Sequence, residues 1–92
     1  EQFIEKVAKT AADRVKIFDI GLTPEHRMQH IVAISAPENM ARLDEIKANN
    51  AKLADPRKIS TSEATTIIQN NPTISWMAYT IHGNESASFE AM

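Results

Sequence analysis

A histidine and a glutamate three residues apart, His82 and Glu85, follow a run of apolar residues near the end of the chain. Residues at this spacing on a turn or a first helical turn can aim both side chains at one point. Imidazole and carboxylate are both zinc ligands, and a catalytic zinc takes three protein ligands and keeps one position for water. Gly83 would let backbone or substrate approach closely, and Asn84 could orient a neighbouring group. The pair predicts part of a metal site; the alternative is that both side chains only cap and solvate the next helix.

The other two histidines lack a metal-like spacing to His82. His26 falls in a predicted loop and His30 on a predicted strand, where histidines are more often solvated or packed than ligands. Glu25 and Arg27 flank His26, and we interpret them as a pair that stabilises the turn rather than as catalytic residues. Because the chain contains no cysteine, disulfides and thiolate metal sites are excluded.

Length and charge restrict the classes of function further. The 92 residues suffice for one domain at most, and 42% of them are hydrophobic, which is enough for a core. The formal net charge of −2, with both signs interspersed, offers no basic surface to nucleic acid or anionic lipid. No run approaches the roughly 18 apolar residues of a membrane span. The first residue is Glu1 rather than Met, so we expect a processed start; we expect a secreted or periplasmic location, with the cytoplasm as the alternative.

The pattern of apolar residues and turn formers predicts the elements that would position the pair. Helical spacing is found in residues 2–13 and 38–54, and strand formers fill 15–22 and 28–35, which we expect to pair as an antiparallel hairpin. A capping box at residues 60–63 opens a short helix that ends near residues 70–72, and another helix is expected from residue 86. The inward side chains of the capped helix are predicted to be Ala64, Ile67 and Ile68.

Residues 73–81 form the most strand-like segment of the chain. Their apolar side chains fall on both faces, which is typical of a strand covered on both sides, so this strand is predicted to be central in its sheet. Trp76 and Tyr79 are expected to be core or flanking residues. The predicted fold class is α/β, with a mixed sheet flanked by helices. In such sheets, sites collect beyond the carboxyl ends of strands, which is where His82 and Glu85 would lie.

Three segments resemble one enzyme family. "IHGNES" resembles the zinc-ligand motif of the carboxypeptidase A-like metallocarboxypeptidases, "FDIGLTPEHRMQHIVAIS" resembles the family's early hairpin, and "PENMARLDEIKANNAKLADPRKIS" resembles an insertion of large bacterial members. The resemblance implies that His82 and Glu85 are the first two zinc ligands. It also implies the N-terminal portion of a zinc-carboxypeptidase-like (phosphorylase/hydrolase-like) fold, so residues 1–92 would be an incomplete N-terminal segment of a single peptidase catalytic domain.

The implied function is a zinc metallocarboxypeptidase, which removes C-terminal residues from peptides by means of a zinc-activated water. Its partner would be a peptide with a free C-terminus; the resemblance assigns no catalytic residue within these 92 residues and places the third zinc ligand and the general base beyond Met92. Two alternatives stay open: a zinc amidohydrolase or deacylase relative, and a non-catalytic α/β binding module. The oligomeric state stays open as well.

Overall fold

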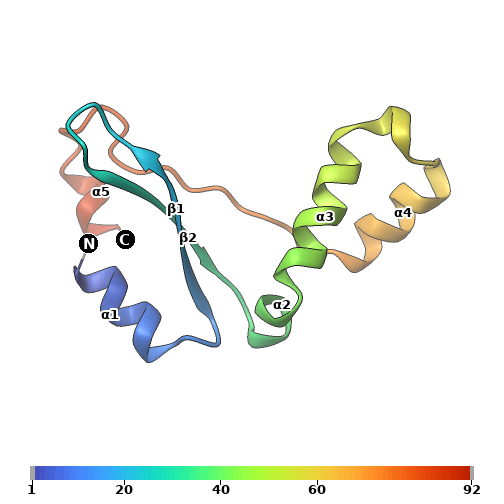
Figure 1. The fold of residues 1–92 in the computed structure, drawn as a ribbon, viewed down its shortest axis with the longest axis horizontal. Helices are drawn as coiled ribbons and strands as arrows, with labels where there is room; N and C mark the ends of the chain where they lie inside the picture. Colours follow the sequence, from blue (N-terminus) through green and yellow to red (C-terminus); the bar gives the residue numbers. More distant parts are fainter. Residues whose placement is uncertain (1, 92) are drawn as a thin grey trace.

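The chain is a mixture of helices and one small sheet, described for residues 2–91 by a computed structural model (Figure 1). The elements follow the order α1 (Gln2–Thr10), β1 (Val15–Leu22), β2 (Met28–Ile34), α2 (Pro37–Ala41), α3 (Leu43–Ala54), the 3-10 turn η1 (Pro56–Lys58), α4 (Thr61–Asn70) and α5 (Ala87–Glu90). The predicted mixture of helices and strands is therefore confirmed. A mixed sheet was predicted, but the sheet found among the described residues has two strands and is antiparallel.

The predicted hairpin is confirmed. β1 pairs antiparallel with β2, from Val15 opposite Ile34 at one end to Leu22 opposite Met28 at the other. Its turn is closed by the backbone N–H of Thr23, which donates to the carbonyl of Arg27 over 2.8 Å. The expected Glu25–Arg27 ion pair also forms on this turn. Local signals sufficed here because the turn and its flanking strands satisfy each other's hydrogen bonds.

The single helix predicted over residues 38–54 is wrong, because the chain forms two helices separated at Arg42. Pro37 begins α2, as expected of a residue whose missing N–H is not needed in a first turn. Arg42 leaves the helical region with φ −116° and ψ 27°. Its guanidinium donates to the carbonyl of Asn70 over 2.8 Å, and this contact with the end of α4 helps to hold Arg42 outside both helices.

The helices α3 and α4 pack against each other, and a further buried residue, Val15, lies at the start of β1. Ile46 on α3 is 3% exposed and Ile67 on α4 is 7% exposed. The predicted helix start is confirmed, since the Ser60 hydroxyl accepts a hydrogen bond from the backbone N–H of Glu63. Ile68 was predicted to face inward, and this prediction is wrong, because its side chain is 66% exposed. Adjacent helical residues point about 100° apart, so only one of the two isoleucines can face α3.

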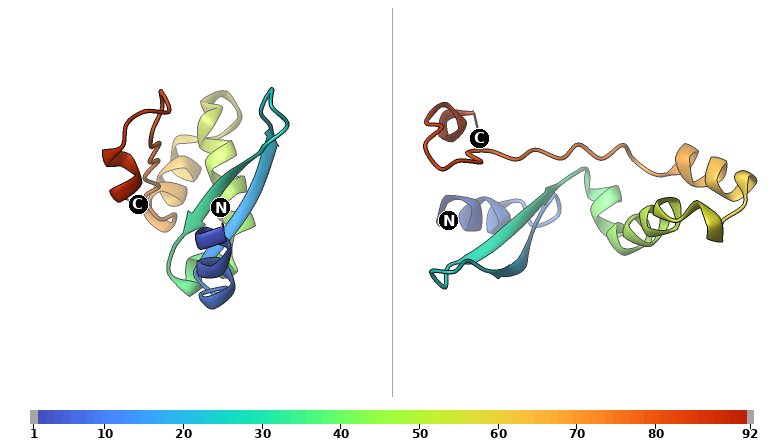
Figure 2. Two further views of the ribbon diagram at one scale, coloured as in Figure 1. Left: turned by 90° about the vertical axis from the view of Figure 1, so that its left-hand side faces the viewer. Right: turned by 90° about the horizontal axis from the view of Figure 1, so that it is seen from above.

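The predicted central strand over residues 73–81 is also wrong for the described chain. The segment is extended but belongs to no sheet, and it runs between α4 and α5 as an isolated stretch (Figure 2). Trp76 is 72% exposed and Tyr79 is 41% exposed, so neither is a core residue. The apolar pattern predicted burial, but a strand also needs neighbours to accept and donate its backbone hydrogen bonds, and β1 and β2 pair only with each other.

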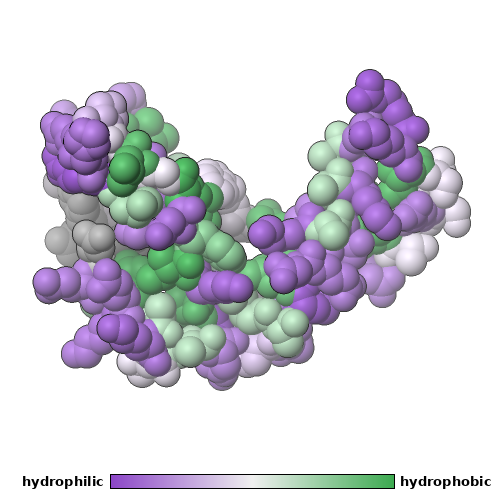
Figure 3. Space-filling view, viewed as in Figure 1, coloured by the Kyte–Doolittle hydropathy of each residue, from purple (hydrophilic) through white to green (hydrophobic). Residues whose placement is uncertain are grey.

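The arrangement is elongated, with a radius of gyration of 16.2 Å and extents of 44 × 29 × 25 Å. α1, the hairpin and α5 lie at one end, and α3 and α4 lie at the other (Figure 1). Apolar surface gathers over the hairpin end on the face shown in Figure 3, whereas the helical end is mostly hydrophilic there. None of the helices within residues 2–91 has the length and apolar character needed to cross a membrane.

Candidate metal-ligand turn

His82 and Glu85 lie on a tight turn that connects the extended segment to α5. The turn begins at Thr80, whose carbonyl accepts a hydrogen bond from the backbone N–H of Gly83 over 3.0 Å. Gly83 has a φ of +84°, in the left-handed region that glycine enters without a steric penalty. This explains the glycine between the two candidate ligands, because an L side chain at this position would be strained.

The turn brings the two candidate ligands into direct contact. The Nδ1 atom of His82 lies 2.5 Å from Oε1 of Glu85. The backbone N–H of His82 also donates to Oε2 of the same carboxylate over 3.0 Å. The side chain of His82 is 79% exposed and that of Glu85 is 37% exposed, so both donor groups remain accessible from solvent.

The electrostatics of the turn favour an ionised carboxylate. The hydrogen bond from the His82 side chain lowers the pKa of Glu85 below its usual value, and the nearby backbone N–H groups act in the same direction. Partial desolvation opposes this shift without reversing it. Glu85 is therefore held in the charged form that metal binding requires.

In the alternative interpretation His82 and Glu85 cap the following helix, but in the described structure neither side chain donates or accepts a hydrogen bond with α5. The N-cap residue of α5 is Ser86, which makes no side-chain cap hydrogen bond. The Glu85 carboxylate turns back to His82, and only the Glu85 backbone carbonyl bonds to α5, through the N–H of Ser88 at 3.0 Å. The two side chains thus close their own turn rather than cap the helix.

The donor set fits part of a zinc site. When two ligand atoms each lie about 2.1 Å from one tetrahedral zinc, they are about 3.4 Å apart. Nδ1 of His82 and Oε1 of Glu85, now 2.5 Å apart, would need to move apart by only about 1 Å to bind the same ion. Within residues 2–91, no three His, Cys, Asp or Glu side chains are arranged to hold a metal ion. Neither His26, exposed on the hairpin turn, nor His30, bonded to Asp19 over 2.9 Å, joins such a group. The described residues therefore offer two candidate ligands of the three expected.

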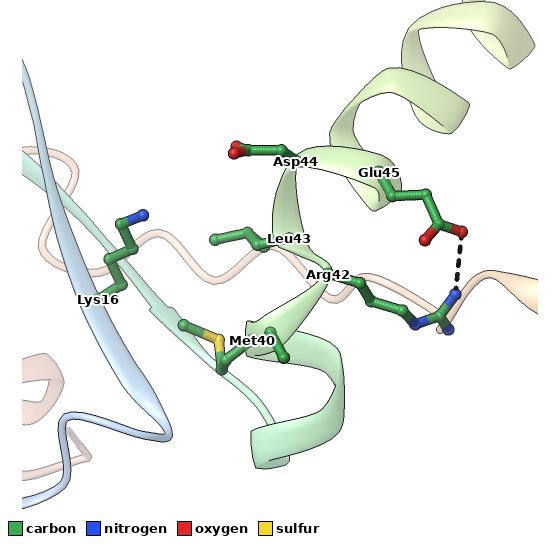
Figure 4. Close-up of a pocket in the computed structure, with 7 residues that line it drawn as sticks. Lys16, Met40, Arg42, Leu43, Asp44 and Glu45 are labelled. Carbon is green, nitrogen blue, oxygen red and sulfur yellow. Dashed lines mark hydrogen bonds and ion pairs between the residues drawn. The ribbon is translucent and has the colours of Figure 1, made fainter.

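A second feature, which the sequence did not indicate, lies between the hairpin and α3. The ammonium groups of Lys16 and Lys47 lie 5.3 and 5.5 Å from the ring centroid of Phe18. Beside them is an open hollow, lined by Lys16 and the segment from Met40 to Glu45 (Figure 4). Lys16 and Phe18 were recognisable as neighbours on one face of a strand, but the approach of Lys47 depends on how α3 is placed. The hollow holds no histidine and is separate in sequence from the His82–Glu85 turn.

No protein-family model matches the chain, and no curated protein or solved structure matches it either. The assignment of the turn therefore depends on its residues and their geometry. His82 and Glu85 are the two candidate ligands, and Asn84 contributes a backbone carbonyl that accepts from the N–H of Ser86 over 3.1 Å.

Proposed function

We propose that the His82–Glu85 turn supplies two zinc ligands in a metallocarboxypeptidase, which hydrolyses the C-terminal residue of peptides. The single observation that supports this proposal is the convergence of the two side chains, with Nδ1 and Oε1 2.5 Å apart on an exposed turn. Spacing along the sequence made such a meeting geometrically possible. The resemblance to the zinc-ligand motif of the carboxypeptidase A-like family gives it a chemical meaning.

Each residue of the turn would have a distinct part in this function. His82 would bind the metal through a ring nitrogen, for which the imidazole must be neutral. Glu85 would bind through its carboxylate, whose lowered pKa keeps it ionised. Gly83 permits the left-handed backbone that brings the two side chains together. When bound, zinc supplies a Lewis acid that activates water and polarises the carbonyl of the substrate.

The first experiment measures zinc binding by the 92-residue chain with isothermal titration calorimetry. Two ligands should provide about half the binding free energy of a four-ligand structural site, which corresponds to a Kd between about 1 µM and about 0.2 mM. His82→Ala and Glu85→Gln should each abolish this binding. His26→Ala is the matched control, because it removes an exposed turn histidine and should leave the Kd unchanged.

Two results would contradict the assignment. A stoichiometric zinc that resists chelators would mean that the ligands lie elsewhere in the chain. Zinc binding that survives in both variants but is lost in His26→Ala would place the metal on the hairpin turn. Nuclear magnetic resonance of the histidine rings during the titration identifies which imidazole is perturbed.

A second experiment separates the enzyme from a non-catalytic binding module. In a chain that continues past Met92 and provides the remaining ligands, His82→Ala should reduce turnover of a peptide with a free C-terminus by about 10³-fold or more. The melting temperature should change little, because the side chain is exposed. Retained turnover with retained zinc would exclude the proposed role, and a peptide blocked at its C-terminus is the control substrate.

A further inference from the structure

The extended segment of residues 73–81 has the composition of a strand and the surroundings of a loop. It contains no charged residue, no glycine and no proline, and β-branched and aromatic residues fill much of it. Its five large apolar side chains are exposed by between 41% and 76%: Ile74, Trp76, Met77, Tyr79 and Ile81. Within the described residues, the backbone of residues 73–79 makes no backbone hydrogen bond. Such a segment is a template for pairing with another strand.

The area available for an interface is large. A compact protein of 10.2 kDa would expose about 5300 Å², whereas this chain exposes 7598 Å². Its radius of gyration of 16.2 Å likewise exceeds the value of about 12 Å expected for a compact chain of this length. This excess of about 2300 Å² is spread over the whole chain and includes the exposed side chains of residues 73–81; an interface of standard size buries roughly 800 Å² per partner.

We propose that residues 73–81 pair with the same segment of a second copy of this chain, as an antiparallel two-stranded ribbon centred on Met77. In that register every large side chain faces a small one or its own counterpart. The cross-strand neighbours are Ile74 with Thr80, Ser75 with Tyr79, Trp76 with Ala78, and Met77 with the Met77 of the other copy. Directly opposed side chains lie close together in antiparallel strands, so alternation of large and small residues lets them interlock.

Two further features favour a second copy as the occupant. Because the segment carries no charge, two copies meet without repulsion between like charges. Thr80 has a φ of +52°, a left-handed conformation that is unusual for a β-branched residue. Pairing as a strand would return Thr80 to the extended region, which β-branched residues prefer.

This association is independent of the proposed metal site. In the antiparallel register the two His82 residues would lie about 34 Å apart, at opposite ends of the ribbon. Dimer formation therefore completes no zinc site. Failure of the zinc experiments would leave this proposal standing, and failure of the dimer would leave the zinc proposal standing.

Sedimentation velocity of the 92-residue chain at increasing concentration tests the association. We expect a dimer whose single tryptophan, Trp76, shows a blue-shifted emission as the dimer forms. Met77→Lys places two lysines opposite each other at the centre of the ribbon and removes the buried methionine pair, so it should weaken the dimer by about tenfold or more. Ile68→Lys is the matched control, since Ile68 is an exposed isoleucine on α4, and it should leave the dimer unchanged.

A mixture of Met77→Lys and Met77→Glu chains should associate again, because the central pair then carries opposite charges. A chain that stays monomeric at every concentration would overturn the proposal. So would an open-ended series of larger species, or a dimer that Ile68→Lys weakens as much as Met77→Lys does.

Disulfide trapping tests the register, because the chain has no cysteine of its own. In the antiparallel register Ser75 faces Tyr79, so a mixture of Ser75→Cys and Tyr79→Cys chains should cross-link readily under mild oxidation. Two Ser75 positions would lie about 14 Å apart, beyond the reach of a disulfide, so Ser75→Cys alone should not cross-link. Efficient cross-linking of Ser75→Cys alone would indicate parallel strands and overturn the register.

Discussion

Replacing either of two adjacent isoleucines with alanine tests how α4 faces α3. Ile67 is 7% exposed and Ile68 is 66% exposed, although the two residues are identical and consecutive. The substitution removes three carbon atoms, and each buried carbon contributes about 0.8 kcal/mol. Ile67→Ala should therefore lose about 2.4 kcal/mol of burial and gain about 0.4 kcal/mol from the higher helix propensity of alanine, a net destabilisation of about 2 kcal/mol. Ile68→Ala loses only about a third of that burial contribution, about 0.8 kcal/mol, and has the same propensity gain, which leaves a net destabilisation of about 0.4 kcal/mol.

The difference of about 1.6 kcal/mol between the variants is large enough to measure. For a domain of this size, 1 kcal/mol shifts the melting temperature by about 4–8 °C, so Ile67→Ala should lower it by about 8–16 °C and Ile68→Ala by about 2–3 °C. Circular dichroism at 222 nm, followed during thermal and urea unfolding, measures both changes. Equal losses in the two variants, or a larger loss for Ile68→Ala, would refute the rotation of α4 described here.

Two further predictions concern the segment between α3 and α4. Hydrogen bonds from Arg57 and, to a lesser extent, Lys58 lower the pKa of Asp55 below its usual value of 3.8. The stabilisation by ionised Asp55 is therefore complete above pH 3.8 and is lost as the pH falls through the lowered pKa of the folded state. Asp55→Asn should thus lower the melting temperature at pH 7, with a difference from wild type that shrinks in acid; a difference independent of pH would contradict this. Ser60→Ala should destabilise the chain by about 1 kcal/mol through loss of the helix cap, as measured by urea unfolding, whereas Ser62→Ala in the first turn should have little effect.

The elements that were predictable from the sequence are those whose stabilising contacts are local. The hairpin of β1 and β2 depends on a five-residue turn, and the start of α4 depends on one hydrogen bond between Ser60 and Glu63. Pro37 likewise favours a helix start whatever the rest of the chain does. In each case the residues that specify the conformation are the ones that adopt it.

The interruption at Arg42 was not predictable in the same way. Helical spacing continues through this residue, and no glycine or proline marks a break. Its hydrogen bond to the carbonyl of Asn70 joins residues 28 positions apart, so it exists only once α4 has packed beside α3. The exposure of Ile68 was not predictable for a similar reason. An apolar residue is expected to be buried, but the sequence does not show which face of α4 packs against α3.

For the candidate site, the spacing of His82 and Glu85 was sufficient to predict that the two side chains could meet. Their contact depends on residues 80–85 alone, through the Thr80–Gly83 turn, the left-handed Gly83 and the hydrogen bond from the His82 backbone to the Glu85 carboxylate. What spacing could not provide is a third ligand, since that residue would come from another part of a folded chain. The role of the turn as a metal site stays a prediction for the zinc titration.

The same reasoning explains why residues 73–81 were predicted as a strand and yet are unpaired. An apolar pattern on both faces reports a tendency to be covered, but it does not identify the covering surface. β1 and β2 satisfy each other's central hydrogen bonds, and the described chain offers the segment no third strand. The segment's charge-free sequence, its exposed side chains and the strained Thr80 are the expected properties of a strand separated from its neighbour. The hydrogen bonds that join His82 to Glu85 lie within residues 82–85, so a neighbour that pairs with residues 73–79 leaves them in place.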